Sequence, residues 1–475
     1  MNDRSPAIVW FRQDLRLADN AALSAAAEAG SPVLPIYILD DDNAGEWALG
    51  AASRWWLHQS LVSLNESLGG RLRCFRGKAE NVLPALVKQT NAGQVFWNRC
   101  YEPWRIRRDK DIKTRLRADG FQVRSFGGSL LFQPQDVSKA DGTPYKVFTP
   151  FYRKGCLANA PQPRAPEPAP TCTVVDTPMP NATVDSLELM PRLGWYKGMA
   201  DTWQPGEGGA LNRLENFLES GIRNYIEGRN RPDLECVSRL SPHLHFGEIS
   251  PRQVWHAANA GAGIAQLENQ LDHFLSELGW REFSHHLLFH WPELPISNLQ
   301  KKFDRFPWRN DDEALRRWCS GHTGYPIVDA GMRQLWETGY MHNRVRMIVG
   351  SFLVKNLMLH WHHGAKWFWD TLVDADLANN SASWQWIAGC GADAAPYFRI
   401  FNPVTQGNKF DPDGNYVRRF VPELSGLPNK HLHSPWEAPE SVLQSASVVL
   451  GKTYPEPIVD LKTSRERALV AFRSL

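Results

Sequence analysis

Short apolar runs alternate with segments of three- and four-residue apolar spacing over the first 130 residues. The runs predict β-strands at Ala7–Phe11, Val33–Leu39, Leu72–Phe75, Gln94–Trp97 and Val123–Phe126. The spaced segments predict helices at Ser53–Leu68, Val82–Lys88 and Trp104–Arg117. Strands that alternate with helices are typical of a doubly wound parallel sheet, so we expect an α/β domain over residues 1–132.

The pattern changes twice along the rest of the chain. It fades after residue 132, and seven prolines lie between 161 and 180, which predicts an extended surface connector over residues 133–205. Helical spacing then returns at Leu211–Ile222, Leu267–Leu288, Asp329–Trp336, Gln334–Met347 and Arg344–Leu359. We therefore expect an all-α domain over residues 206–475. A chain of 475 residues is also long enough for two cores.

The first predicted strand runs into Arg12–Arg16, where a dinucleotide-binding fold of the usual kind would carry a glycine-rich turn. That phosphate cradle is missing from the sequence. We expect any dinucleotide to bind elsewhere in the protein.

Composition excludes several classes of protein. No run of 18 apolar residues and no apolar signal core follow Met1, so we expect a cytoplasmic protein that does not enter a membrane. The seven cysteines are scattered, which indicates neither a disulfide framework nor a metal site. The net charge is +2, so affinity for nucleic acid would need a local basic face.

Ten of the twenty tryptophans lie between Trp280 and Trp386, among charged and amide side chains. This crowding indicates a site that stacks aromatic groups or relays electrons. The alternative is that the indoles fill a large helical core, where each buries roughly 200 Å².

Three groups of residues carry candidate chemistry, each with a simpler alternative. Ser238–Ser241 precedes a helical run and offers hydroxyls and free backbone donors to a phosphate, or only a helix cap. Arg346 and Asp374 lie in apolar sequence and are expected to pair, either in a site or only to lock two helices. Glu277, Trp280 and Arg281 share one helix face that suits a planar heterocycle, or is merely amphipathic.

Together these residues match a known family. The chain resembles the photolyase/cryptochrome flavoproteins along nearly its whole length, and within them the bacterial class III cyclobutane pyrimidine dimer photolyases. The motifs that carry the resemblance are Trp10–Arg16 with Asp19–Asn20, Ser238–Pro242, Trp280–Phe283, Thr323–Pro326, Met341–Met347, Trp384–Trp386 and Gly389–Asp393.

This resemblance implies FAD in the helical domain, with Asn380 facing flavin N5. Val237 stands where the family usually has threonine. The segment that is predicted to bind the phosphates therefore has one hydroxyl fewer. Carried over by position, the cofactor-binding residues are Tyr225, Val237, Ser238, Arg239, Leu240, Ser241, Phe274, Arg281, Arg346, Asp374, Asp376 and Asn380.

The resemblance also implies that UV-damaged DNA is the partner and that blue light drives an electron from reduced FAD into a pyrimidine dimer. The implied catalytic residues are Glu277, Asn343 and Asn380. Those for the lesion and DNA are Arg229, Glu277, Trp280, Asn343, Arg344, Met347, Trp386, Arg399 and Gln406, and those for photoreduction are Trp308, Trp361 and Trp384.

Three related functions remain as alternatives. A signalling cryptochrome would keep the flavin without repair, but plant members carry an aliphatic residue at the position of Trp280. A (6-4) photolyase would carry a histidine where this chain has Asn343. A flavoprotein that only binds DNA would do so in light and darkness alike.

The family resemblance further implies a second, light-harvesting chromophore in the α/β domain and a monomeric protein. Methenyltetrahydrofolate is our first expectation and a deazaflavin the second, with Trp104 or Glu102 as contacts. The Pro103–Arg105 sequence after Glu102 departs from that of folate-using enzymes.

Overall fold

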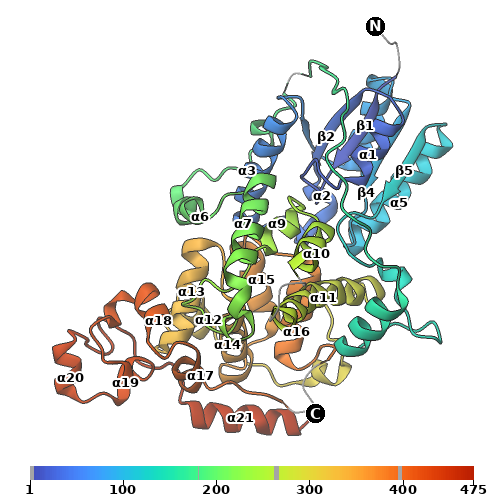
Figure 1. Cartoon of the computed structure of the whole chain (residues 1–475). Helices are drawn as coiled ribbons and strands as arrows, with labels where there is room; N and C mark the ends of the chain where they lie inside the picture. The colour runs from blue at the N-terminus through green and yellow to red at the C-terminus, as the bar shows by residue number, and fades with distance from the viewer. Residues whose placement is uncertain (1–4, 180, 262–266, 394–397) are drawn as a thin grey trace.

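The computed structural model describes residues 5–179, 181–261, 267–393 and 398–475. Two parts share the chain: an α/β domain, blue to cyan in Figure 1, above a helical domain, green to red. The segment that joins them runs down one side of the molecule. Both expected classes of domain are therefore confirmed.

The sheet of the α/β domain has five parallel strands in the order β3-β2-β1-β4-β5. All five predicted strands are present within two residues at each end. Their bounds are β1 Ala7–Phe11, β2 Val33–Leu39, β3 Arg73–Arg76, β4 Gln94–Asn98 and β5 Gln122–Phe126.

Alternate residues of β1 face opposite layers of helices. Val9 packs in one core with side chains of α1 and α3, and Trp10 packs in another with α4 and α5. The helices of this domain are α1 Ala21–Glu28, α2 Asp41–Ala44, α3 Ala51–Ser67, α4 Ala79–Gln89 and α5 Pro103–Ala118. We did not predict α1, because its alanine-rich sequence has little apolar spacing.

The segment that we expected to be an extended connector is only partly so. Residues 160–179 have almost no regular structure apart from a bridge between Val174 and Val33. Pro150–Asn159, in contrast, forms a π-helix whose Phe151 and Tyr152 are buried in the helical core. The connector therefore contributes side chains to the domain that it precedes.

The helical domain contains many short helices around the long α11. Their bounds are α6 Lys197–Thr202, α7 Glu207–Glu219, α8 Tyr225–Gly228, α9 Ser241–Phe246, α10 Pro251–Ala260, α11 Glu268–His290, α12 Asp312–Cys319, α13 Pro326–Thr338, α14 Asn343–Ser351, α15 Trp361–Thr371, α16 Leu377–Ala388, α17 Pro403–Phe410, α18 Asn415–Phe420, α19 Asn429–Leu432, α20 Glu440–Ser445 and α21 Leu461–Arg473.

Two predicted helix boundaries are wrong. We expected one helix over Gln334–Met347, but α13 ends before Gly339, whose φ of 65° is left-handed, and α14 begins afresh at Asn343. The helix expected over Arg344–Leu359 is α-helical only to Ser351 and continues as a π-helix to Asn356. Helical spacing in the sequence did not reveal either break.

The motif at Arg12–Arg16 joins the two domains. The Arg16 guanidinium donates to the backbone oxygen of Gly247 at 2.9 Å, and Arg252 of α10 pairs with Asp19 at 2.6 Å. Trp56 of α3 donates to the Glu248 carboxylate at 2.9 Å. These buried polar contacts fix the α/β domain on the helical domain.

Candidate functional site

The predicted cofactor residues come from several neighbouring parts of the helical domain. Helix α11 packs against α8 and α16, and α16 also packs against α14. Residues 237–241 lead into α9, and the Ser241 hydroxyl at its start bonds to Asp374, which brings this segment to the same region. This packing brings together side chains that are up to 155 positions apart in the sequence, from Tyr225 to Asn380.

The expected pair between Arg346 and Asp374 is confirmed. The Arg346 Nη2 atom lies 2.9 and 3.1 Å from the two carboxylate oxygens of Asp374. Ser241 donates its hydroxyl to Asp374 Oδ2 at 2.6 Å. This hydrogen bond links the predicted phosphate-binding segment, Ser238–Ser241, to the Arg346–Asp374 pair. The Arg346 Nε atom donates to the backbone oxygen of Met341 at 2.7 Å, which fixes the guanidinium plane.

Asp376 holds the start of α16 and lies between two histidines. Its carboxylate accepts from the Asn379 amide at 2.8 Å, and His245 and His285 each lie 3.5 Å from its Oδ2. Burial raises the pKa of Asp376, but His285, His245 and Arg281 outweigh burial and hold the pKa well below its usual range. The carboxylate is therefore charged, and Arg281 belongs to the same cluster.

Four arginines surround the buried ring of His342. Its pKa is lowered to about 3, first by burial and then by Arg239, Arg344, Arg346 and Arg229. The ring is therefore neutral near pH 7. An anionic group of FAD, such as its diphosphate, would find charged hydrogen-bond donors among these arginines.

Several buried donor and acceptor atoms near this site have no hydrogen-bond partner within the described residues. They are His342 Nε2, Arg239 Nε, Arg344 Nε and His245 Nε2. Native proteins rarely leave such atoms unsatisfied, because each costs free energy. A polar ligand that reaches them would remove that cost, so the residues present fit FAD.

The other predicted cofactor residues frame this cluster. The rings of Tyr225 and Phe274 meet edge to face at 5.6 Å. Asn380 donates its side-chain amide to the Ala365 backbone oxygen at 3.0 Å, which fixes its orientation. Arg239 has a left-handed φ of 51°, and Ser238 accepts weakly from the Leu240 amide at 3.5 Å. Val237 is half-buried against the same apolar core as Phe274.

The residues predicted for DNA come from several parts of the helical domain. Glu277 of α11 pairs with Arg229 at 2.7 Å, and Asn343 at the start of α14 is exposed. Arg344 lies 4.5 Å from the Phe410 ring centroid, and its Nη1 is 3.7 Å from Met347 Sδ.

The two tryptophans that we expect to stack on the lesion are Trp280 and Trp386. Both are half-buried, on α11 and α16, and these helices are in contact. Arg399 is exposed and close enough to Arg344 to lower its pKa, after burial and Arg229. Gln406 lies apart from α11, on α17, which packs against α13.

The three tryptophans predicted for photoreduction run from the core toward the surface. Trp384 and Trp361 are 4% and 1% exposed, whereas Trp308 is half-buried. A Cβ at Gly364 would lie 2.1 Å from the Trp384 ring, so glycine lets α15 approach this indole. His360 lies between the outer two, with ring centroids 5.7 Å from Trp361 and 5.0 Å from Trp308.

Sequence reasoning missed the role of Glu282. This buried carboxylate accepts from the backbone amides of Leu131 and Phe132, at 2.9 and 3.1 Å, where the chain leaves the α/β domain. Burial raises the pKa of Glu282 to about 7, against the opposing effects of Arg281 and these two amides. The only signal in the sequence was its place in the Trp280–Phe283 motif.

Sequence reasoning also missed the histidines around the cofactor residues. His342 directly precedes Asn343, and His245 follows the Ser238–Pro242 motif, so proximity to a motif could have identified both. A single histidine has no spacing pattern that distinguishes a site from a core.

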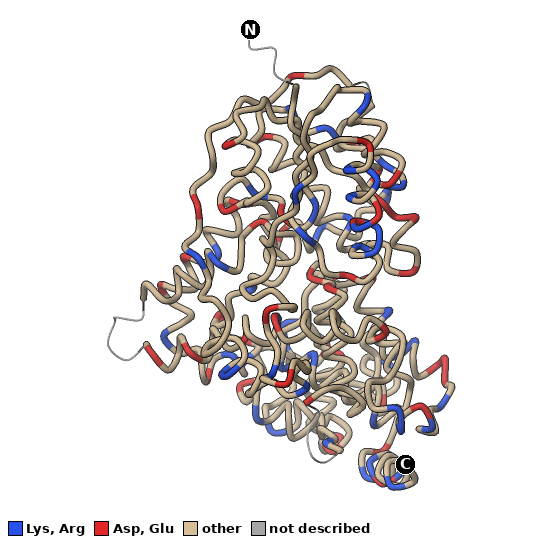
Figure 2. The backbone as a smooth tube through the Cα atoms, turned by 90° about the vertical axis from the view of Figure 1, so that its right-hand side faces the viewer, with Lys and Arg blue, Asp and Glu red and all other residues tan. Residues whose placement is uncertain are grey.

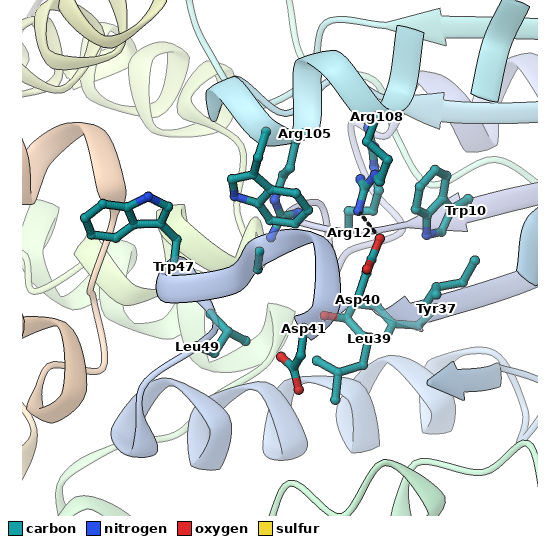
Figure 3. Close-up of a pocket in the computed structure, with 13 residues that line it drawn as sticks. Trp10, Arg12, Tyr37, Leu39, Asp40, Asp41, Trp47, Leu49, Arg105 and Arg108 are labelled. Carbon is teal, nitrogen blue, oxygen red and sulfur yellow. Dashed lines mark hydrogen bonds and ion pairs between the residues drawn. The ribbon is translucent and has the colours of Figure 1, made fainter. Parts of the chain in front are cut away.

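A pocket opens in the α/β domain at the carboxyl end of β2. It encloses about 420 Å³, part of it open to solvent. In Figure 3, Arg105 and Arg108 reach in from α5 and Asp40 approaches Arg108 from the other side, whereas the Asp41 carboxylate points away from them and pairs with Arg54 of α3. The lining residues are Trp10, Arg12, Tyr37, Ile38, Leu39, Asp40, Asp41, Ala44, Trp47, Leu49, Trp104, Arg105 and Arg108.

Each arginine of this pocket has a carboxylate partner. Arg108 pairs with Asp40 at 3.0 Å, Arg105 pairs with Glu102 at 3.2 Å, and Arg12 pairs with Asp109. Of the two contacts expected for a second chromophore, Trp104 lines the pocket. Glu102 is not a lining residue and holds Arg105 in place.

Two features are absent from the described ranges, 5–179, 181–261, 267–393 and 398–475. These ranges contain no helix that is long and apolar enough to cross a membrane. They also contain no group of three or more histidine, cysteine, aspartate or glutamate side chains that could hold a metal ion. Acidic and basic side chains are interspersed over both domains (Figure 2).

Comparison with known proteins agrees with this architecture. Residues 7–171 match the family model of DNA photolyase, and residues 274–474 match that of the FAD binding domain of DNA photolyase. A deoxyribodipyrimidine photo-lyase of Agrobacterium fabrum is 51% identical, over 99% of this chain and 98% of its own. Cryptochrome-1 of Arabidopsis thaliana is 41% identical, over 97% of this chain and 69% of its own.

A solved structure shows the same relation in three dimensions. The crystal structure of a bacterial class III photolyase from Agrobacterium tumefaciens superposes with a TM-score of 0.95 at 51% identity, covering 100% of this chain and 98% of the other. Identity at this level over the full length shows common descent. The chain belongs to the DNA photolyase/cryptochrome family.

Proposed function

We propose that this protein repairs cyclobutane pyrimidine dimers in DNA under blue light, as a photo-lyase that uses FAD. The observation that carries the proposal is full-length similarity to a deoxyribodipyrimidine photo-lyase, together with Trp280 and Trp386 on two helices, α11 and α16, that pack on each other, while α16 also packs on the α14 helix of Arg346. Two indoles near a cationic, donor-rich site suit a flipped-out pair of pyrimidines.

The helical residues would hold the cofactor by charge and by hydrogen bonds. Arg346 and Asp374 fix each other, and the Asp374 carboxylate also fixes Ser241, so a polar ring edge would meet side chains that are already ordered. Asn380 would present a neutral amide that hydrogen-bonds flavin N5 without supplying an acidic proton. The bound, reduced cofactor supplies one electron to the dimer on illumination and takes it back after the two cyclobutane bonds break.

The lesion residues would bind and orient the dimer rather than react covalently with it. Trp280 and Trp386 would stack on the pyrimidine faces, and Glu277, Asn343 and Met347 would contact the edges. Extrusion of a poorly stacked, damaged dinucleotide costs less than extrusion of intact bases, which gives selectivity. Arg229, Arg344, Arg399 and Gln406 would contact the DNA strand.

The decisive test is light-dependent repair. Purified protein, reduced without oxygen and mixed with a thymine-dimer oligonucleotide, should restore thymine absorbance under blue light and not in the dark. Trp280→Ala should weaken binding of the dimer and leave the flavin spectrum unchanged. Wild-type protein that keeps its flavin but restores no thymine in the light would contradict repair.

The second candidate is a blue-light photoreceptor, which the similarity to a plant cryptochrome favours. Such a protein would reduce its flavin in light but show no preference for dimer-containing DNA. The same assay therefore separates the two functions. Trp280, an aromatic residue beside Glu277 and Arg229, supports repair.

We also propose that Trp384, Trp361 and Trp308 carry electrons from the surface to an oxidised flavin. The decreasing burial from Trp361 to Trp308 supports this direction. Trp361→Phe should slow photoreduction of the oxidised protein. Repair by protein that was reduced beforehand should stay at the wild-type rate.

For the α/β pocket we propose a light-harvesting chromophore, with methenyltetrahydrofolate first and a deazaflavin second. Trp10, Trp47 and Trp104 offer apolar faces for a planar heterocycle, and the pocket lies where ligands bind in open parallel sheets, at the carboxyl ends of strands. Mass spectrometry of the extracted chromophore decides its identity. Trp104→Ala should lose that chromophore and keep FAD. We further propose a monomer, which light scattering checks.

A further inference from the structure

Three aromatic rings form a parallel column beside the proposed lesion site. Tyr152 and Phe148 stack with centroids 5.6 Å apart at an interplanar angle of 10°, and Phe148 stacks on Trp280 at 3.9 Å and 10°. Tyr152 and Phe148 belong to the connecting segment, whereas Trp280 lies on α11.

The column has a buried end and an accessible end. Tyr152 is 1% exposed and Phe148 is 9% exposed, whereas Trp280 is half-buried. A Cβ at Gly279 would lie 2.6 Å from the Tyr152 ring, so the glycine before Trp280 allows the connecting segment to pack this closely. Because Phe148 covers one face of the Trp280 indole, a further planar group can stack only on the other face.

Phe148 is also linked to the second tryptophan. Its backbone amide donates to the Asp393 carboxylate at 3.3 Å, and the backbone oxygen of Asp393 accepts from Trp386 Nε1 at 3.1 Å. Asp393 adopts a left-handed φ of 50°, a conformation that aspartate tolerates better than most residues. One residue of the connecting segment thus contacts Trp280 directly and reaches Trp386 through Asp393.

We propose that Phe148 and Asp393 are positioning residues that set the orientation of Trp280 and Trp386 before the dimer arrives. Pre-ordered rings bind more tightly, because less side-chain freedom is lost when the ligand stacks on them. The connecting segment would then be part of the lesion site, although it touches neither the flavin nor the dimer. This inference rests on the proposed repair function.

A double-mutant cycle tests action through Trp280. Phe148→Leu removes the ring and keeps an apolar side chain, so the dissociation constant for a thymine-dimer oligonucleotide should rise about fivefold, a part of the stacking contribution of one base. In a Trp280→Ala background the same substitution should cause no further loss. At saturating oligonucleotide, the rate of repair by reduced Phe148→Leu protein should equal that of wild type.

The matched control is Phe96→Leu in β4. Phe96 is buried and stacks on Phe126 at 6.3 Å, so it loses a similar ring contact in the other domain. It should lower the thermal midpoint without changing affinity for the dimer. The flavin spectrum of each variant shows whether the helical domain remains intact.

The Asp393 link has its own pair of variants. Asp393→Gly removes the carboxylate but suits a positive φ, and it should weaken dimer binding about threefold, a small fraction of one base stack. Asp393→Asn keeps an oxygen acceptor for the Phe148 amide and should bind nearly as well as wild type.

Three results would overturn the inference. Phe148→Leu could bind the thymine-dimer oligonucleotide as tightly as wild type, or it could lose the same affinity in the Trp280→Ala background as in wild type. The third result is equal affinity of Asp393→Gly and Asp393→Asn for the oligonucleotide. Failure of the proposed function looks different. In that case wild-type protein itself would neither prefer the dimer nor repair it in the light.

Discussion

The helical site and the α/β pocket both gather arginines and tryptophans, but they balance charge differently. In the pocket, Arg12, Arg105 and Arg108 each pair with a carboxylate of the same domain. Around His342, Arg229, Arg239 and Arg346 pair with Glu277, Glu235 and Asp374, but Arg344 has no carboxylate partner among the described residues and donates to the side-chain oxygen of Asn230 at 2.5 Å.

This difference indicates how each site depends on its ligand. A pocket whose charges are paired internally can stay folded without a chromophore, because no buried charge is left uncompensated. A site in which one half-buried arginine, Arg344, lacks a carboxylate partner among the described residues is completed by an anionic ligand. We therefore infer that the helical domain needs bound FAD for its full stability. The α/β domain, in contrast, should be stable without the second chromophore.

Removal of FAD should have the largest effect. A ligand at a thousand times its dissociation constant stabilises the folded state by about 4 kcal/mol, so flavin-free protein should unfold at a clearly lower temperature. Removal of only the second chromophore should shift the thermal midpoint much less. Differential scanning calorimetry of the complete protein, the FAD-free protein and the protein without its second chromophore measures these thermal midpoints. Equal shifts in the two depleted forms would contradict the proposed difference between the sites.

Asp374→Asn should come next. It leaves Arg346 partly buried without an anion, which costs about 3 kcal/mol, and flavin should be lost on purification. Asp40→Asn is the matched change in the pocket, because Asp40 holds Arg108 in the same way. That variant should also be less stable but retain FAD, as flavin absorbance of the purified proteins would show.

Glu282 connects the two domains, and its raised pKa predicts that the free energy of unfolding depends on pH. Its pKa is raised by burial, from the ordinary value of 4.5 to about 7, so the folded protein holds this proton more tightly than the unfolded chain. The resulting stabilisation is complete below about pH 4 and is lost as the pH rises toward 7.

At about 1.4 kcal/mol per pKa unit, this contribution amounts to about 3 kcal/mol between pH 4 and 7. Glu282→Gln carries no such proton, so the difference in unfolding free energy between wild type and variant should change by that amount from pH 4 to 7. Parallel stability curves from urea unfolding at several pH values would contradict the shifted pKa.

Arg344→Gln should have the smallest effect. If Arg344 contacts a DNA phosphate, its loss should weaken binding to all sequences by about 1 kcal/mol and reduce the slope of log affinity against log salt by about one. Arg105→Gln in the pocket should leave that slope unchanged. Binding titrations at several salt concentrations measure the affinity for DNA and its salt slope in both variants. An equal change in the two variants would contradict a specific contact between Arg344 and DNA.

Much of the architecture was present in the sequence. The apolar runs located all five strands, and the three central ones, β2, β1 and β4, are almost wholly buried because helices cover both faces of the parallel sheet. The motifs around Ser238, Trp280 and Arg346 identified residues that the fold does bring together, and the Arg346–Asp374 pair followed from the cost of burying a lone charge. The domain boundaries and the roles in binding stay predictions.

Local patterns did not determine how distant segments meet. The glycine break before α14, the burial of Tyr152 and the stacking of Phe148 on Trp280 depend on helices that pack from elsewhere in the chain. The proton affinity of Glu282 likewise depends on amides from residues 131 and 132.

The sequence by itself therefore determined which elements form and which side chains are chemically capable. Only the tertiary structure decided which of them share a site and with what charge. The physical reason is range: periodicity and capping act over a few residues, whereas desolvation, ring stacking and ion pairing depend on whatever the fold places within a few ångströms.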